Sequence, residues 1–391
     1  MRAIMSAISP QEKKAALSIA ALVSLRVYGL FLILPVFSVY AEQLPFATPM
    51  LIGLAVGVYG LTQAILQVPM GLLSDFWGRK KVMALGLVMF LVGSVVAALA
   101  NDIYWILVGR CIQGMGAIAS TGMAFIADVS RPEQRAKMMG IVGASIGFAF
   151  MLSFITGPIL AQWIGVKGLF WFTAFLAVCA LLLLFSSISE PEKKVKKGFS
   201  WAELLVAVKQ KDLLLLDVFV FLLHASMTAI FVVLPLVMVH RLSFETSHHW
   251  QFYVPVLVLS LFIMVPLIIA QEKKQQHVLF MLVALICLSF SVLFLGLGLD
   301  ALWLLAVLMT LYFGLFNFLE AAMPSFLSKR ADDRYRGAAM GMYSSSQFFG
   351  AFIGGVLAGY VMQWQYEYVF YTVFALLFVV SILGIKVFKQ P

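Results

Sequence analysis

The sequence predicts an all-α polytopic membrane protein, in which twelve transmembrane helices form two parallel, pseudo-symmetric bundles of six. Three observations predict this fold: the composition, the length of the apolar runs and an internal repeat. Of the 391 residues, 63% are hydrophobic and 12% are charged, whereas a soluble domain has about 45–50% and about 25%. Because so little polar surface cannot cover a single soluble core, we expect the chain to lie in a lipid bilayer.

Twelve apolar runs account for the predicted helices. Each is close to or above the length of about 20 residues that a helix needs to cross the hydrocarbon core. Prolines inside these runs are tolerated, since neighbouring helices can satisfy the backbone groups that a proline frees. In chain order, the expected spans are 15–41, 49–72, 82–100, 103–128, 134–165, 167–188, 212–240, 248–271, 278–299, 301–328, 337–363 and 367–387.

Basic residues set the predicted orientation. If the N-terminus is cytoplasmic, nearly all of the 27 lysines and arginines fall in inner segments, and only Lys167 and Arg241 fall in outer ones. Inner loops of membrane proteins carry this excess of positive charge, so we expect both termini in the cytoplasm. The formal net charge of +9 is then an orientation signal, and we expect no nucleic-acid partner.

An internal repeat divides the chain. Leu34-Pro35 in the first span recurs as Leu234-Pro235 in the seventh, and the segment 135–140 resembles the segment 336–341. A constant offset between matching positions predicts two parallel halves of six helices. A charged stretch with a proline separates them, as is typical of a linker. We therefore expect a first bundle at 1–188, a cytoplasmic linker at 189–211 and a second bundle at 212–391.

A charged turn lies between the second and third spans. Its pattern, G-x-x-x-D-x-x-G-R-K, places Asp75 between Gly71 and Gly78 and continues with Arg79. Charges at this density are too costly in hydrocarbon, so the turn must lie at a membrane surface. A simple loop anchor would need only lysines and arginines, and that alternative does not account for the acid.

This turn resembles the signature loop of the major facilitator superfamily of transporters. The segment 109–117, with Arg110, resembles the second motif of that superfamily, and Gly157-Pro158 is similar to the kink of its proton antiporters. Arg26 and the segment 343–348 further resemble its YajR-like group, which is bacterial, proton-driven and similar to drug exporters. The resemblance covers the whole chain and implies the superfamily fold in the bacterial cytoplasmic (inner) membrane.

The resemblance also implies a gate on the cytoplasmic side. Asp75 would lie against the N-terminus of the span 337–363, whose dipole favours a negative charge, and Arg79 would pair with Asp128. Binding to lipid headgroups is the alternative for the basic residues of the loop, although it leaves the acids unexplained. The expected gating residues are Gly71, Asp75, Gly78, Arg79, Asp128 and Arg135.

Ionisable side chains inside the predicted helices are candidates for proton coupling. Glu320 lies well inside its span, where removal from water makes the ionised form costly, and a histidine titrates near neutral pH. Structural roles are the alternatives: a neutral or paired Glu320, a hydrogen bond between helices at His224, and an Arg110 that pins helices through backbone carbonyls. The candidates are Glu320, His224, Arg26, Arg110 and Asp217.

A substrate cavity is expected between the two halves, near the middle of the bilayer. Polar and aromatic positions on the helices that face it are the candidate lining. The candidates are Tyr28, Tyr59, Gln63, Gln67, Gln113, Tyr253, Asn317, Tyr343 and Gln347.

The sequence favours a secondary transporter that exports small apolar or cationic compounds against proton entry. Import by proton symport is one alternative, and a membrane scaffold without transport activity is another. The sequence has no Walker loop, catalytic motif or metal-ligand spacing, so we expect no enzyme activity, no cofactor and no metal. We expect a monomer whose partners are the lipid bilayer, a small-molecule substrate and the proton.

Overall fold

The structure, a computed structural model, describes residues 9–188, 190, 209–332 and 335–388. Regular secondary structure in these ranges is entirely helical. The N-terminal half contains α1 (Pro10–Phe31), α2 (Leu34–Glu42), α3 (Pro49–Trp77), α4 (Arg79–Leu99), α5 (Ile103–Met115), α6 (Ala119–Val129) and α7 (Pro132–Ser187). The C-terminal half contains α9 (Lys211–His240), η2 (Thr246–His248), α10 (His249–Lys274), α11 (His277–Leu297), α12 (Leu302–Arg330), α13 (Arg336–Val361) and α14 (Tyr366–Phe388).

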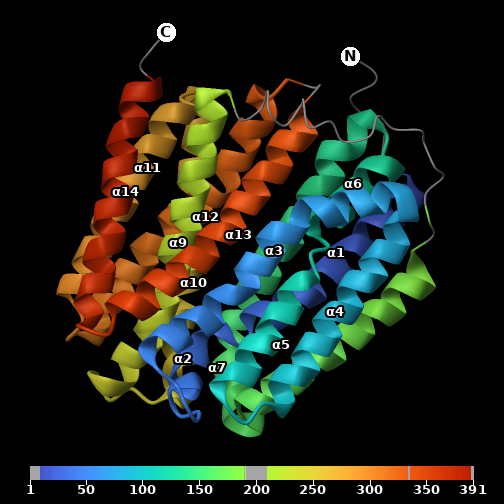
Figure 1. The fold of residues 1–391 in the computed structure, drawn as a ribbon. Helices are drawn as coiled ribbons and strands as arrows, with labels where there is room; N and C mark the ends of the chain where they lie inside the picture. The colour runs from blue at the N-terminus through green and yellow to red at the C-terminus, as the bar shows by residue number, and fades with distance from the viewer. Residues whose placement is uncertain (1–8, 189, 191–208, 333–334, 389–391) are drawn as a thin grey trace.

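The helices form two bundles that stand side by side (Figure 1). α1 to α7 make one bundle and α9 to α14 make the other, and the start of α1 and the end of α14 lie at the same end of the molecule. The all-α polytopic fold is therefore confirmed. The expected linker at 189–211 lies mostly outside the described residues, so the domain boundaries stay predictions.

By length and composition, ten helical segments of the described chain could cross a membrane. The twelve predicted spans reduce to ten for two reasons. The predicted spans 134–165 and 167–188 form one segment, Glu133–Ser187, and α13 is not among the ten. α13 carries glycines and serines where the other helices carry leucine and phenylalanine, because it packs closely against helices on both sides.

The long helix α7 breaks where the sequence analysis separated two spans. Gly165 has φ 67° and ψ 173°, a left-handed backbone conformation that glycine adopts without steric cost. The helix continues through Gly157 and Pro158. A Cβ atom at Gly157 would lie 2.2 Å from the carbonyl oxygen of Leu32, so this glycine permits close packing of α7 against the first span, and the kink at this position stays a prediction.

The two bundles meet along a seam between α3 and α13. A Cβ atom at Gly53 would lie 2.2 Å from the carbonyl oxygen of Gly355, and one at Gly57 would lie 2.7 Å from that of Phe352. Small residues of this kind let helix backbones approach closely in a membrane. We call this contact the glycine seam; its members are Gly53, Gly57, Gly60, Gly355 and Gly359.

Further contacts between the bundles lie at the predicted outer end. Ser38 on α2 donates a hydrogen bond to the carbonyl of Phe231 on α9, and Glu42 lies 2.7 Å from His240. Deeper in the molecule, Phe154 of α7 packs edge-on against Phe231 with ring centroids 4.7 Å apart. These contacts join the two bundles at and below the predicted outer end, beside a cavity of about 210 Å³ that residues of both bundles line.

Gly355→Val is expected to disrupt the glycine seam, because the added side chain has no room against the backbone of α3. Overpacking of this kind costs typically about 1–3 kcal/mol, and the melting temperature of the purified protein should fall. Thermal unfolding in one detergent provides the measurement. The matched control is Gly147→Val, since a Cβ at Gly147 meets nothing within 4 Å. Equal losses in the two variants would contradict the role of the seam.

Candidate functional site

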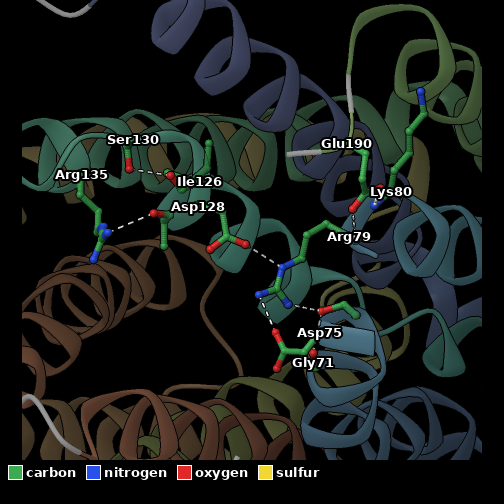
Figure 2. Close-up of polar contacts among 11 residues, drawn as sticks. Gly71, Asp75, Arg79, Lys80, Ile126, Asp128, Ser130, Arg135 and Glu190 are labelled. Atoms are coloured by element: carbon green, nitrogen blue, oxygen red, sulfur yellow. Dashed lines mark hydrogen bonds and ion pairs between the residues drawn. The ribbon is translucent and has the colours of Figure 1, made fainter. Parts of the chain in front are cut away.

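The guanidinium group of Arg79 is the centre of the signature loop. Its Nη2 lies 2.6 Å from Asp75 at the end of α3, and its Nε donates to Asp128 on α6 over 2.9 Å. Nη1 donates to the hydroxyl of Ser74. Figure 2 shows these groups converging on one arginine from two helices. A single buried cation therefore ties the end of α3, the start of α4 and the end of α6 together.

The same loop also holds the chain that follows α7. The carboxylate of Glu190 accepts hydrogen bonds from the backbone N–H groups of Arg79, at 2.5 Å, and Lys80, at 2.9 Å. In return, the ammonium of Lys80 donates to the carbonyl of Ile188 over 2.7 Å. An anion at a helix N-terminus and a cation at a helix C-terminus are both favoured by the helix dipole. The start of α4 and the end of α7 thus cap each other (Figure 2).

Gly78 is required by this arrangement for two separate reasons. Its φ is 102°, a conformation that side chains with a Cβ rarely adopt. A Cβ atom there would also lie 2.8 Å from the Glu190 carboxylate. The second glycine of the signature pattern therefore makes room for an acid more than a hundred positions away in the sequence.

The remaining predicted gating residues take peripheral positions. Gly71 accepts a hydrogen bond from Ser74 through its carbonyl, and exposed Arg135 donates to the carbonyl of Ala127 over 3.0 Å. The pairing of Arg79 with Asp128 that the resemblance implied is present. The recorded partner of Asp75 is Arg79, so the contact of Asp75 with the N-terminus of α13 stays a prediction.

A second ion pair at this end of the molecule escaped the sequence analysis. Glu12 accepts from the backbone N–H, Nε and Nη2 of Arg131, at 3.0, 3.0 and 2.8 Å. The hydrogen bond to Glu12 raises the pKa of Arg131. Glu12 also completes a capping box with Ser9 at the start of α1, and this Ser-x-x-Glu spacing is the one signal by which the residue could have been found.

Two arginines lie inside the N-terminal bundle without an acid. Arg26 on α1 donates from Nη2 to the Tyr59 hydroxyl at 2.6 Å and to the Gln63 side-chain oxygen at 2.7 Å. Arg110 on α5 donates to Gln113 over 3.0 Å and to the carbonyl of Ala55 over 3.3 Å. Among the described residues neither arginine forms an ion pair, so hydroxyl, amide and carbonyl oxygens solvate both charges. An acidic partner for Arg26, which the sequence left open, is not found there.

The aromatic ring of Tyr59 lies between these two charges. The guanidinium carbon of Arg26 is 5.9 Å from the ring centroid and that of Arg110 is 5.2 Å away. A cation over an aromatic face is attracted by the negative charge of the ring, by about 2 kcal/mol or more where water is excluded. The ring and the surrounding oxygens thus partly offset the cost of two buried positive charges.

The predicted cavity residues form two groups, and Tyr28 and Tyr253 lie apart from both. One group is buried in the N-terminal bundle, around the two arginines. Tyr28 bonds to Thr156 over 2.8 Å, Tyr253 packs against Phe154 and Phe231, and the rest lie near Glu320. The first group is Tyr59, Gln63, Gln67 and Gln113, and the group near Glu320 is Asn317, Tyr343 and Gln347. Their contact with substrate stays a prediction.

Glu320, Gln347 and His224 form a cluster from three helices of the C-terminal bundle. The side-chain nitrogen of Gln347 on α13 donates to Glu320 on α12 over 3.0 Å and lies 2.8 Å from His224 Nε2 on α9. The second oxygen of Glu320 is 3.6 Å from the same imidazole nitrogen. The Glu320 side chain is 37% exposed and that of His224 is 9% exposed, so the acid is more exposed than the imidazole, although its Oε2 atom is buried.

The described residues contain no group of three or more histidine, cysteine, aspartate or glutamate side chains that could hold a metal ion. The three cysteines, Cys111, Cys179 and Cys287, are all free thiols. The candidate site therefore consists of side chains that form hydrogen bonds and ion pairs or that can titrate.

Comparison with known proteins identifies the family. A model described as Major Facilitator Superfamily matches residues 17–331 and 277–391. The chain belongs to the major facilitator superfamily. The match confirms the resemblance that the signature loop indicated. Members of this superfamily are membrane transporters and not enzymes, so the protein is a multi-pass membrane transporter.

The chain is similar to several individual members of the superfamily. The inner membrane transport protein YajR of Escherichia coli (strain K12) is 37% identical over 359 residues, which cover 90% of this chain and 78% of YajR. The quinolone resistance protein NorA of Staphylococcus aureus (strain MRSA252) is 26% identical, with 85% of each protein covered. A bacterial homologue of the human lysosomal transporter Spinster shares the fold, with a TM-score of 0.78 at 12% identity over 98% of both chains.

Gly78→Ala is expected to destabilise this superfamily member, because the left-handed backbone costs about 1–2 kcal/mol with a Cβ atom and the methyl group meets Glu190. Glu190→Ala alone should also destabilise it by removing the cap of α4. The double variant should lose less stability than the two single variants lose together, because without the Glu190 carboxylate the added methyl group has nothing to clash with. Thermal unfolding of the four proteins measures this coupling, and strictly additive losses would argue against it.

Proposed function

We propose that this transporter exports small apolar or cationic compounds in exchange for protons, by alternating access. The observation that carries the proposal is the hydrogen bonding of Gln347 between Glu320 and His224. This arrangement can exist in more than one protonation state, and Gln347 on α13 would make different hydrogen bonds in each.

The hydrogen bonds around His224 suit a neutral imidazole in the proposed cycle. The amide nitrogen of Gln347 has only hydrogens to offer, and it contacts Glu320 and His224 Nε2. His224 Nε2 must therefore accept, while His224 Nδ1 donates to the carbonyl of Val220 over 3.2 Å. An imidazole that donates from one nitrogen and accepts at the other is neutral.

A proton that arrives at this cluster must rearrange it. If His224 gains a proton, Nε2 becomes a donor and can no longer accept from Gln347. If Glu320 gains it, the acid loses its charge and its strong attraction for the amide. In both cases Gln347 has to turn or move, and Gln347 lies on α13, the helix that forms the glycine seam with α3. Protonation would thereby act on the contact between the two bundles.

The distribution of buried charge supports a cationic rather than an anionic substrate. Arg26 and Arg110 are 3% and 6% exposed, and both are enclosed within the N-terminal bundle. Glu320 is the partly exposed charged group of the central clusters described above. A cation that approached Glu320 would replace the proton that neutralises it, and competition of this kind is the basis of exchange.

The relatives support export as the direction. NorA is a quinolone resistance protein, and resistance is the expected outcome when a membrane transporter lowers the internal concentration of a drug. Proton symport remains the second candidate, because the Glu320 cluster would work equally in either direction. The relative direction of proton and substrate movement separates the two.

Glu320→Gln is expected to abolish proton-coupled transport, since glutamine imitates the protonated acid and cannot exchange its proton. The protein is reconstituted into vesicles with an imposed pH gradient, with ethidium as the cationic probe and a pH-sensitive dye in the lumen. Wild-type protein should move ethidium and protons in opposite directions. Glu320→Gln should move neither against a gradient and should bind ethidium more weakly, while folding is retained.

The matched control is Glu272→Gln, an exposed acid of α10 that pairs with Lys329 over 3.4 Å, and it should behave like wild type. Movement of ethidium and protons in the same direction would favour symport. Failure of the wild-type protein to move any lipophilic cation would contradict the proposed substrate class. If Glu320→Gln retains coupling, another group carries the proton.

Asp75→Asn is expected to raise access from the cytoplasmic side, if this acid also holds the N-terminus of α13 in the outward-facing state. A carboxylate at a helix end contributes about 0.3–1 kcal/mol, and up to about 2 kcal/mol when partly buried, enough to shift a balanced equilibrium. The measurement is the labelling rate of Asn317→Cys in a background without the native cysteines. Asp102→Asn, which alters a cap at the outer end of the molecule, is the control, and equal labelling in all three would rule out the gating role.

A further inference from the structure

The hydrogen-bonded clusters described above leave out Asp217, a buried acid on α9. Asp217 is 4% exposed. Both of its carboxylate oxygens are buried, and neither has a hydrogen-bond partner among the described residues. An ionised carboxylate without partners costs far more in a dry interior than a neutral one, so a group in this setting takes up a proton. In this conformation Asp217 is therefore a neutral carboxylic acid.

The packing of α9 against α13 places Asp217 below the Glu320 cluster. A Cβ at Gly350 would lie 2.0 Å from the carbonyl oxygen of Phe221, and one at Gly354 would lie 2.1 Å from that of Ala225. The two contacts are one helical turn apart on both helices. At the same spacing, one further turn towards the start of each helix places Asp217 level with the segment 343–346 of α13. Asp217 also lies about two turns before His224, on the same face of α9.

Tyr343 lies close enough to Glu320 and to Asp217 to interact electrostatically with both. It lies about one turn before Gln347 on α13, and Gln347 is the residue that donates to Glu320. Its side chain is buried, and its hydroxyl has no hydrogen-bond partner among the described residues. A buried hydroxyl without a partner is costly, so we expect the Tyr343 hydroxyl to form a hydrogen bond in another state of the protein. Tyr343 therefore offers a hydroxyl near both carboxyl groups, and a hydroxyl can accept one proton while it donates another.

Among the described residues, no ion pair gives Asp217 a counter-charge. α13 contributes Tyr343 and α12 contributes Glu320, while α14 meets the neighbouring turn of α9 with Gly384, which packs against Phe219. On α9 itself, His224 is directed to Gln347 and Glu320. Towards the predicted cytoplasmic end, Asp212 pairs with Arg330 over 2.6 Å, so this arginine is already occupied by another acid.

We propose that Asp217 is a second proton station, which receives the proton from Glu320 through the hydroxyl of Tyr343 and passes it to the cytoplasm. In the transfer, the Glu320 carboxyl gives its proton to the oxygen of Tyr343, and Tyr343 gives its own proton to the carboxylate of Asp217. One O–H bond forms for each that breaks, and the negative charge moves from Asp217 to Glu320. In this proposal the structure represents the state after this step, with Asp217 neutral and the side chain of Glu320 partly exposed.

This inference rests on the proposed proton coupling, but its first test requires no substrate and no transport. The infrared spectrum of the purified protein at neutral pH should contain a carboxylic-acid carbonyl band from Asp217. Asp217→Asn should lose the band, and Glu320→Gln should keep it. If wild type and Asp217→Asn have the same carboxylic-acid absorption, Asp217 is ionised and the inference is wrong, whatever the vesicle experiments show.

A second measurement separates a relay from a merely buried acid. After a rapid change of pH, the carboxylate band of Glu320 should reach its new value at least about tenfold more slowly in Asp217→Asn and in Tyr343→Phe than in wild type. Tyr343→Phe should retain the carboxylic-acid band of Asp217, which shows that the fold around it is intact. Unchanged rates in both variants would overturn the relay. Loss of ethidium transport in the wild type with slowed rates in the variants would reject only the proposed function.

Discussion

The packing of α13 between α3 and α9 is the constraint on which the rest of this structure depends. On one side, Gly355 and Gly359 bring α13 against the backbone of the opposite bundle, and on the other, Gly350 and Gly354 bring it against α9. Because α13 is packed this closely on both sides, we expect the movement of a side chain on one side to change its contacts on the other. The hydrogen bonds of Gln347 are therefore linked to the contact between the bundles, and this link is what a transporter needs to connect chemistry with a change of shape.

The unpaired charges near the middle of the two bundles differ in sign. The N-terminal bundle encloses two arginines that are solvated by neutral oxygens and by the ring of Tyr59. In the part of the C-terminal bundle that the structure describes, the acids near the middle are Glu320 and Asp217, and neither forms an ion pair with an arginine. Because the arginines are enclosed and Glu320 is partly exposed, the proposed exchange assigns proton uptake to the second half.

Much of this organisation could be predicted from the sequence, because long apolar runs and the signature pattern are local features. The separation of the spans 134–165 and 167–188 coincides with the backbone break at Gly165, and Arg79 and Asp128 pair as the superfamily resemblance implied. The partners of Arg26 could not be predicted, since hydroxyl and amide groups solvate it instead of an acid. Glu190 was also missed, because an acid in a charged linker gives no sign of the helix end it caps.

The reciprocal caps of Glu190 and Lys80 have a mechanical consequence. Glu190 fixes the chain that leaves α7 to the start of α4, and Lys80 fixes the end of α7 to the same turn. The exit of the chain from the N-terminal bundle is therefore anchored at the loop that Arg79 organises, and Gly78 leaves the space for this anchor.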